Sequence, residues 1–367
     1  MDKTTIGFIG LGLIGGSLAK AIRRAYPDFI IKAFDTDREC LTAALSDGTL
    51  NHAHDSIDTS FADCQIIFLC TPVSINIEKL KDLKNTINES CILTDVGSVK
   101  STIHEAVITY DLEQNFIGGH PMTGSEKAGY QNANRHLFEN AYYIITPTKK
   151  SNKEQVDFLI SILKETGSLP LILDFHKHDF IMAAISHLPH IIAYALVNLV
   201  KDSDNEDGLI QMLAAGGFKD ITRIASASPA MWQQICIENN TYIQKALDTY
   251  MTSLTNINLA IADNNTDFII RYFNQAKTFR DNIPQARAKG YIKPLFEIYV
   301  DIIDEAGAIA TLSTILASNS ISIKNIGIVH HREFQEGALR IEFDAAGAAK
   351  KAVRILRKFH YTVHERC

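Results

Sequence analysis

The chain has 367 residues, a formal net charge of −6 and a pI near 6.1, with 46% hydrophobic and 21% charged residues. This length predicts two or three domains, and the acidic balance without a basic run argues against a nucleic-acid partner. No apolar run reaches the ~18 residues that cross a membrane, and we expect no signal peptide. Six cysteines without a CxxC pair favour reduced thiols in a cytoplasmic protein.

Short apolar runs alternate with helical stretches over residues 1–174. We predict strands at 5–9, 30–34, 65–69, 91–95, 115–118, 142–146 and 170–173. Several of these are nearly continuous apolar runs, which is typical of strands that helices bury on both faces. The alternation therefore predicts a mostly parallel, doubly wound α/β domain of the Rossmann type.

A glycine-rich loop follows the first predicted strand. In 6-IGFIGLGLIGGSLAKAI-22, Gly10, Gly12 and Gly15 form a GxGxxG spacing between a strand and a helix. The first glycine permits a tight turn, the second lets the backbone approach a pyrophosphate, and the third lets the helix pack on the strand. The helix N-terminus, at Leu13 and Ile14, supplies amide donors. The pattern predicts a dinucleotide site, the alternative being glycines that serve packing only.

Residues after three later strands complete the predicted cofactor site. Asp35, twenty residues after the last of these glycines, is placed to bond a ribose 2′-hydroxyl and to repel a 2′-phosphate, which favours NAD over NADP despite Arg38 nearby. Ligands bind outside the carboxyl ends of parallel strands, so we expect Thr71, Pro72 and Ser98 at the nicotinamide. For the loop with Thr71 and Pro72, and for the loop with Ser98, the alternative is a capped turn into a helix.

A histidine follows another predicted strand at the same edge. The stretch 116-FIGGHPMTGSEKAGY-130 places His120 where the strand enters a glycine-rich loop, and we expect Gly118 and Gly119 to let the chain turn there. A neutral histidine at this edge can accept a proton from a substrate hydroxyl as hydride leaves the same carbon. Such a base needs a partner on its other nitrogen, and we predict Ser98 for that role. The alternative is a solvent-facing loop histidine.

Strand-like runs vanish from residue 175 to residue 285. Helices are predicted there at 179–201, 208–218, 220–225, 229–264 and 266–280, which makes the second domain all-α. The stretch 182–200 is apolar nearly all round, so we expect this helix to be buried, in part by another subunit. The apolar helices therefore suggest a homodimer.

Two histidines and a tryptophan are candidate binding residues of this domain. His187 and His190 in 186-SHLPH-190 share one helical face, and Pro189 between them is expected to kink the helix. Trp232 is the only tryptophan of the chain. The alternatives are core or interface histidines and a core indole.

Charged residues of the same domain form two further candidates. Arg223 ends the stretch 216-GGFKDITR-223 and could clamp a carboxylate with two hydrogen bonds, the alternative being a surface ion pair. His176, His178 and Asp179 resemble a metal pair, but no third ligand has a convincing spacing. We therefore predict no metal site.

The strand period returns after a polar segment at 286–294, which we interpret as a linker. Between residues 295 and 367, alternating apolar residues predict strands at 295–303, 321–330, 337–343 and 361–363, with helices at 308–317 and 346–359. This βαββαβ order predicts a small α+β unit of the ferredoxin-like type.

The motifs taken together resemble the prephenate dehydrogenase family. The resemblance is carried by GLGLIGGS, DVGSVK, GGHPMTGSEKAG, SHLPH and GGFKDITRIASASPAMW, in that order, and covers roughly residues 4–290. The tail looks like an ACT domain, a module that commonly binds amino acids, although Ala306 precedes Gly307 where many such domains have a Pro-Gly pair. The resemblance implies NAD-dependent oxidative decarboxylation of prephenate, with tyrosine as a feedback inhibitor that acts through the tail.

The resemblance also implies roles for individual residues. His120 matches the catalytic histidine that bonds the C4 hydroxyl of prephenate, and Ser98 matches the serine that orients it. Arg223 matches an arginine that binds a substrate carboxylate, and His190 matches a second histidine that contacts the substrate. The other positions matched to the substrate pocket are Ser125, Glu126, Ser186, His187 and Trp232.

Three alternatives stay open at this point. An arogenate dehydrogenase would act on the amino-acid counterpart of prephenate. A dehydrogenase of 3-hydroxy acids would share a helical second domain, but it usually has a lysine motif where SHLPH stands. A non-catalytic sensor would bind NAD and an amino acid without chemistry, and the intact set of His120, Ser98 and Arg223 argues against it.

Overall fold

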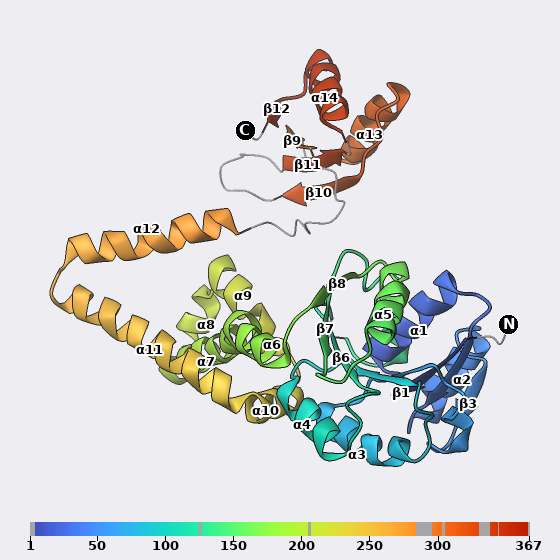
Figure 1. Cartoon of the computed structure of the whole chain (residues 1–367). Helices are drawn as coiled ribbons and strands as arrows, with labels where there is room; N and C mark the ends of the chain where they lie inside the picture. Colours follow the sequence, from blue (N-terminus) through green and yellow to red (C-terminus); the bar gives the residue numbers. More distant parts are fainter. Residues whose placement is uncertain are drawn as a thin grey trace. The chain divides into compact units, whose positions relative to one another are not determined.

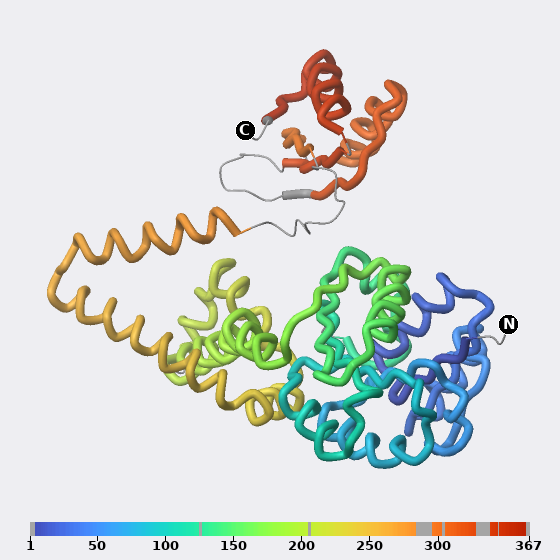
Figure 2. Tube along the Cα trace, viewed as in Figure 1, coloured from blue at the N-terminus to red at the C-terminus, as the bar shows by residue number. Residues whose placement is uncertain are grey.

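The computed structural model describes residues 4–124, 127–204, 207–283, 296–302, 305–329, 338–343 and 345–365. The chain divides into two compact units, Met1–Ile283 and Pro284–Cys367. Figure 1 labels the elements of each unit, and Figure 2 traces the chain through them. Two candidate residues, Ser125 and Glu126, lie outside the described residues.

Five parallel strands open the first unit, in the order β3-β2-β1-β4-β5. The elements are β1 (Thr5–Ile9), α1 (Leu13–Ala25), β2 (Ile30–Phe34), α2 (Arg38–Ser46), β3 (His52–His54), β4 (Ile66–Leu69), α3 (Val73–Lys84), β5 (Ile92–Asp95) and α4 (Ser101–Thr109). The order confirms the predicted Rossmann-type arrangement. The short strand β3 escapes prediction because it alternates histidine and alanine and has no apolar run.

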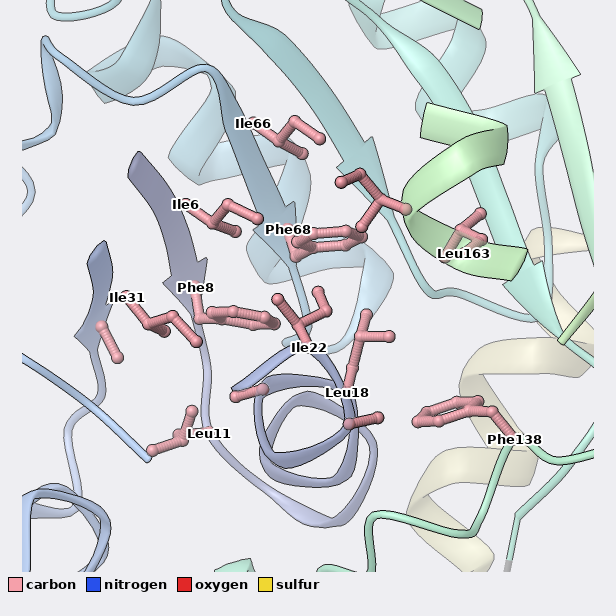
Figure 3. Close-up of a cluster of buried hydrophobic side chains, with 14 of the residues drawn as sticks. Ile6, Phe8, Leu11, Leu18, Ile22, Ile31, Ile66, Phe68, Phe138 and Leu163 are labelled. Atoms are coloured by element: carbon pink, nitrogen blue, oxygen red, sulfur yellow. The ribbon is translucent and has the colours of Figure 1, made fainter. Parts of the chain in front are cut away.

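Aromatic packing fixes helix α1 against this sheet. Figure 3 shows Phe8 of β1 and Phe68 of β4 pointing toward Leu18 and Ile22 of α1. The two rings are stacked with their centroids 5.1 Å apart, and all four side chains are fully buried. Each such burial stabilises the fold by about 1.5–3 kcal/mol. The packing therefore holds the N-terminus of α1 at the carboxyl end of β1.

A second sheet, in the order β6-β7-β8, continues the first. Its elements are β6 (Ile117–Pro121), β7 (Tyr142–Pro147), α5 (Lys153–Glu165) and β8 (Leu169–Ile172), with β7 antiparallel to β6 and parallel to β8. An isolated parallel bridge between Leu93 and Phe116 links β5 to β6. The predicted bounds 115–118 are wrong for this strand, because β6 includes His120 and the two glycines before it.

Helices make up the rest of the first unit. They are α6 (Phe175–Met182), a π-helical turn (Ala183–His187), α7 (Leu188–Ser203), α8 (Leu209–Leu213), α9 (Gly216–Thr222), α10 (Pro229–Glu238), α11 (Asn240–Ala262) and α12 (Thr266–Asn282). The predicted helix 229–264 is wrong as a single element, because Asn239 separates α10 from α11. The predicted helix 208–218 is divided in the same way, at residues 214–215. α11 and α12 pair as a hairpin (Figure 1).

The stretch Phe175–Ser203 is long and apolar enough to cross a membrane, by length and composition alone. It also binds the first domain through Asp179, whose carboxylate accepts hydrogen bonds from the backbone N–H groups of Lys100 (2.8 Å) and Ser101 (2.7 Å). The predicted burial of residues 182–200 is wrong within a single chain, since Ile185 and Leu199 are exposed. These side chains leave apolar surface exposed in the single chain.

The second unit has the predicted βαββαβ order. Its elements are β9 (Phe296–Asp301), α13 (Ala308–Ser318), β10 (Asn325–Val329), β11 (Ala338–Phe343), α14 (Ala346–Lys358) and β12 (Val363–Glu365). The strands pair antiparallel in the order β10-β11-β9-β12. Ile298, Val300, Leu339 and Ile341 point into a core shared with both helices, as their alternation predicts. Gly307 precedes α13 with a φ of +96°, a conformation that favours glycine.

Candidate active site

The glycine loop between β1 and α1 has the geometry of a dinucleotide site. Gly10 has a φ of +92°, and a Cβ on Gly15 would stand 2.4 Å from the Gly10 carbonyl oxygen, so the loop tolerates no side chain at either position. Gly12 begins α1 with no side-chain cap, and a Cβ there would meet nothing within 4 Å. The first amides of α1, at Leu13 and Ile14, have no acceptor within the helix and no side-chain cap, so they are available to a pyrophosphate.

Asp35 is held at the end of β2 next to this loop. Its carboxylate accepts hydrogen bonds from the backbone N–H groups of Leu11 (2.6 Å) and Asp37 (2.8 Å). A carboxylate fixed in this way can accept from ribose hydroxyls and would repel a 2′-phosphate. Arg38, the residue that could accommodate such a phosphate, is exposed and pairs with Asp55 at 3.4 Å. These residues fit NAD.

The loops after β4 and β5 reach the same edge of the sheet. The Thr71 hydroxyl donates to the buried Asn76 side chain, whose amide donates to the Leu69 carbonyl at 3.3 Å, and Pro72 precedes α3. Ser98 is half-buried between β5 and α4. Within the described residues no hydrogen bond joins Ser98 to His120. The orienting role of Ser98 therefore stays a prediction, and the contact that the structure gives to His120 Nδ1 comes from another residue.

A buried ion pair holds the chain just before His120. Asp95 and Lys100 are fully buried and paired. The Asp95 carboxylate accepts from the Gly119 N–H at 3.1 Å, and the Lys100 ammonium donates to the Gly119 carbonyl at 2.8 Å. These side chains thus satisfy both backbone groups of Gly119 at the point where β6 leaves β5.

The two glycines before His120 serve close packing and not a turn. A Cβ on Gly118 would lie 2.2 Å from Thr146 Oγ1, and one on Gly119 would lie 2.5 Å from the Asp95 carbonyl oxygen. Neither glycine has a positive φ. The expectation that they let the chain turn is therefore wrong, because both lie inside the extended strand β6.

The partner of His120 is His178, from helix α6. His120 Nδ1 lies 2.8 Å from His178 Nε2, and His178 Nδ1 lies 2.7 Å from Asp179 Oδ1. A carboxylate only accepts, so His178 donates to Asp179 through Nδ1 and accepts from His120 through Nε2. The proton of a neutral His120 is consequently on Nδ1. Its Nε2, which has no protein partner among the described residues, carries the free lone pair that a base needs.

The surroundings of His120, His178 and Asp179 keep the two histidines neutral and the aspartate ionised. Burial, followed by the charges of His178, Lys100 and His187, holds the pKa of His120 well below its usual range. Burial also lowers the pKa of His178. Hydrogen bonds from His178, Ser101 and the backbone of Lys100 lower the pKa of Asp179 against the opposing effect of burial. At neutral pH both histidines are neutral and Asp179 is a carboxylate.

A π-helical turn presents the second pair of histidines. Pro189 lacks an N–H, so the helix cannot continue regularly through SHLPH, and the Leu188 N–H bonds back to Ala183 instead. His187 is fully buried, and His190 is half-buried and stacks on Trp232 with ring centroids 3.7 Å apart. The kink predicted at Pro189 thus takes the form of a π-turn.

Trp232 and the arginine lie near these histidines. Trp232 is buried and also contacts His187 edge-on at 6.0 Å, so it packs in a small cluster that includes Val99. Arg223 is exposed at the end of α9, close enough for its charge to lower the pKa of His190 after the larger effect of burial. The Ser186 carbonyl accepts from His190 Nδ1 at 2.9 Å. His190 therefore lies near both Trp232 and Arg223, whereas the hydrogen-bond partner of His120 is His178.

Sequence comparison decides the family. Residues 18–169 match the prephenate dehydrogenase nucleotide-binding domain, and residues 174–275 match the prephenate dehydrogenase dimerization domain. A prephenate dehydrogenase of Bacillus subtilis is 39% identical over 352 residues, which cover 95% of each chain. The chain belongs to the prephenate dehydrogenase family. It is accordingly an NAD-dependent oxidoreductase, as the glycine loop and Asp35 predict.

Two solved structures of this family resemble the chain. Prephenate dehydrogenase from A. aeolicus, in complex with hydroxyphenyl propionate and NAD⁺, is 30% identical with a TM-score of 0.73, covering 77% of this chain and 99% of its own. Arogenate dehydrogenase from Synechocystis is 31% identical with a TM-score of 0.69, covering 76% of this chain and 99% of its own. Family membership alone therefore leaves prephenate and arogenate as candidate substrates.

The sequence did not predict the residues that hold His120 in place in this member of the prephenate dehydrogenase family. In the sequence, His178 and Asp179 resemble only a metal pair, and the described residues contain no group of three ligands that could hold a metal ion. Asp95 and Lys100 frame the motif DVGSVK, yet only Ser98 stood out in it. Asp95, Lys100 and Asp179 lie in apolar stretches of the sequence, and such residues are buried only when they are paired. This pattern could have indicated a buried network.

Proposed function

We propose that the chain oxidises and decarboxylates prephenate to 4-hydroxyphenylpyruvate, with release of CO₂ and NADH, in the cytoplasmic synthesis of tyrosine. The observation that carries this proposal is the hydrogen-bonded series Asp179–His178–His120, which leaves a bare Nε2 near the carboxyl end of β6, the edge at which the dinucleotide loop also lies. A neutral base of this kind suits an alcohol whose carbon loses hydride.

We propose that the side chains of the protein orient the substrate and transfer its proton. His120 Nε2 accepts the proton of the C4 hydroxyl as hydride leaves and returns it to the same oxygen as the phenol forms, while its own Nδ1–H remains bonded to His178. NAD, when bound at α1 and Asp35, supplies the hydride acceptor. As CO₂ leaves C1 the ring becomes aromatic, so the driving force comes from the substrate and the site must chiefly position it. Ser98, Ser186, His187, His190, Trp232 and Arg223 are the residues proposed to line the substrate pocket.

Arogenate is the second candidate substrate. The observation that favours it is the likeness to the Synechocystis arogenate dehydrogenase, whose identity to this chain equals that of the prephenate dehydrogenase within one percentage point. The two substrates differ in a side-chain ammonium instead of a keto group. The ratio of kcat/KM for prephenate and arogenate, with NAD as cofactor, decides between them.

Formation of NADH from prephenate tests the proposal directly. We expect turnover of prephenate with NAD and a much lower rate with NADP, because Asp35 is fixed where a 2′-phosphate would lie. A chain that binds NAD and tyrosine but turns over neither prephenate nor arogenate would instead be the non-catalytic sensor.

The second unit is proposed to be an ACT domain that binds tyrosine and inhibits the reaction. Its βαββαβ order and the left-handed Gly307 before α13 support this assignment. Calorimetry on the full chain should show tyrosine binding, and tyrosine should lower the rate of NADH formation. Absence of heat with both tyrosine and phenylalanine would contradict the assignment.

The proposed assembly is a homodimer. The support comes from the match of residues 174–275 to a dimerization domain and from exposed apolar side chains on its helices. These include Phe180, Ile185, Leu199, Met212, Leu213, Ile221, Ile237, Met251, Leu259, Ile261, Ile270, Phe273 and Phe279. So many exposed apolar groups on one domain exceed what a monomer usually presents. Analytical ultracentrifugation of the full chain measures the state.

A further inference from the structure

Asn239 occupies the break between α10 and α11, where the sequence predicts one continuous helix. The residue is 2% exposed, so its amide must be satisfied by the protein. Its Nδ2 lies 2.9 Å from the backbone carbonyl oxygen of Asp179 and 3.0 Å from His187 Nδ1. Both of these partners belong to the helical stretch that carries the active-site histidines.

The carbonyl fixes which way the amide points. A backbone carbonyl oxygen only accepts, so the atom of Asn239 that faces Asp179 must be the NH₂ group. The second hydrogen of this group then points at His187 Nδ1. A ring nitrogen that receives a hydrogen bond cannot carry a proton, and the proton of His187 is therefore on Nε2.

We propose that Asn239 is a positioning residue that holds His187 as its neutral Nε2–H tautomer, so that His187 donates a hydrogen bond to an acceptor oxygen of the substrate. The substrate part of this inference rests on the proposed function. His187 Nε2 has no hydrogen-bond partner within the described residues, and the ring is fixed edge-on against Trp232. The donor is uncharged at neutral pH, because burial lowers the pKa of His187 to about 4 and Nδ1 bonds to an amide.

Asp179 thereby sets the two histidines of the site in opposite tautomers. Its side chain acts through His178 and leaves His120 Nε2 bare, as a proton acceptor requires. Its backbone carbonyl acts through Asn239 and leaves His187 Nε2 protonated, as a donor requires. One residue thus separates the base from the donor, and His187 cannot compete with His120 for the substrate proton.

Two substitutions distinguish this role from plain structural support. Asn239→Asp keeps the size of the side chain but replaces the donor with an acceptor, so the His187 proton should move to Nδ1, as it does in His178 beside Asp179. Asn239→Ala removes the hydrogen bonds without reversing them, and a free imidazole already favours the Nε2–H tautomer. The neighbouring exposed Asn240→Asp adds the same charge as a matched control.

The experiment combines NMR with kinetics on the full chain at pH 8.5, where an unpaired histidine is neutral. In chain labelled with ¹⁵N-histidine and free of substrate, the ¹⁵N shifts of His187, assigned by their absence in His187→Asn, should show Nε2–H in the wild type and Nδ1–H in Asn239→Asp. With prephenate and saturating NAD, Asn239→Asp should raise KM by ~10-fold or more, the usual effect of losing a hydrogen bond to a charged group. Its kcat should change less than KM.

The alanine variant decides between the two roles of Asn239. The proposal expects Asn239→Ala to raise KM less than Asn239→Asp, and Asn240→Asp to leave KM unchanged. A structural role alone predicts the reverse order, because alanine leaves the larger void. Nδ1–H in the unliganded wild type, or an unchanged KM in Asn239→Asp, would overturn the proposal. If the wild type turns over neither substrate, the proposed function fails while the NMR result still tests the tautomer.

Discussion

A histidine can act as an acid, a base or a simple donor, and its other ring nitrogen decides which. In His120 that nitrogen bonds to His178, whose far side bonds to the carboxylate of Asp179. The order of donors along this chain leaves one free lone pair, directed away from the partner. The position of the His120 proton is thus set by a contact between residues 58 positions apart.

Replacement of His120 tests its role as the base. His120→Asn removes the proton acceptor but keeps a polar side chain of smaller size. We expect kcat to fall by ~10²–10⁴, the range for a lost acid–base group, with the affinity for NAD retained. Stopped-flow and steady-state measurements of NADH formation check the rate, and fluorescence titration checks NAD binding. Turnover near the wild-type rate would remove His120 from the mechanism.

Replacement of His178 tests whether its hydrogen bond orients His120. His178→Gln keeps an acceptor for the His120 Nδ1–H, whereas His178→Leu does not. We expect kcat to fall by ~10² in the leucine variant and by clearly less in the glutamine variant, with KM similar in both. Equal losses of kcat in the two variants would mean that His178 only fills space.

Replacement of Arg223 tests the proposed clamp on a substrate carboxylate. Arg223→Ala should raise KM for prephenate by ~10–100-fold, as expected for a lost hydrogen bond to a charged group, and should change kcat less. Arg223→Lys, which keeps the charge but loses the planar fork, should recover part of the affinity. An unchanged KM in Arg223→Ala would exclude the clamp.

At the scale of elements, the junction of β5 and β6 positions His120. Backbone pairing between these strands is limited to an isolated bridge at Leu93, and beyond it the Asp95–Lys100 pair binds both backbone groups of Gly119. Helix α6 arrives at the same point, because the Lys100 and Ser101 amides bind Asp179. The end of β6, the loop between β5 and α4, and helix α6 thus meet around His120.

Gly119→Ala should disturb this junction more than its single methyl group suggests. The added Cβ would lie 2.5 Å from the Asp95 carbonyl oxygen and 2.9 Å from Tyr143 Cε1, so the strand must shift. We expect a loss of stability of ~1–3 kcal/mol in urea unfolding, together with a lower kcat because His120 moves. The control Gly347→Ala, at a helical glycine where a Cβ meets nothing within 4 Å, should not destabilise the fold.

At the scale of the whole molecule, buried neutral histidines make the fold sensitive to acid. Burial, followed by the charge of Lys100, lowers the pKa of His104 to about 3, and burial lowers the pKa of His187 to about 4. In the unfolded chain both groups titrate near 6.5. Below that pH the unfolded chain binds protons that the folded chain excludes, so acid favours unfolding.

The contribution of these two histidines to the free energy of unfolding should therefore be constant above pH ~7 and should fall as the pH drops from ~6.5 to ~4. By pH 4 each of the two histidines should cost on the order of 3 kcal/mol of stability. Urea unfolding between pH 7.5 and pH 5 measures the slope, and His104→Gln should reduce it. A slope that is equally steep in His104→Gln and in the wild type would contradict this assignment of neutral histidines.

Local sequence determined those features whose causes lie within a few residues. The strands β1 and β2 have the predicted bounds, since each is a short apolar run between turns, and the GxGxxG loop and Asp35 form one site because they follow adjacent strands. The βαββαβ order of the second unit follows equally from alternation. In each case periodicity and turn chemistry act over distances that a sequence shows.

The tertiary structure alone decided how the active-site groups are paired. Nothing in the sequence of FIGGHPMTG shows that His178 and not Ser98 will meet His120, or that Gly119 needs space beside Asp95. Asn239 likewise lies within a helical pattern, and only the contacts of α11 with α6 and with the π-helical turn bring it to His187. Hydrogen-bond partners and tautomers depend on distances between elements, and those distances are fixed when the layers pack.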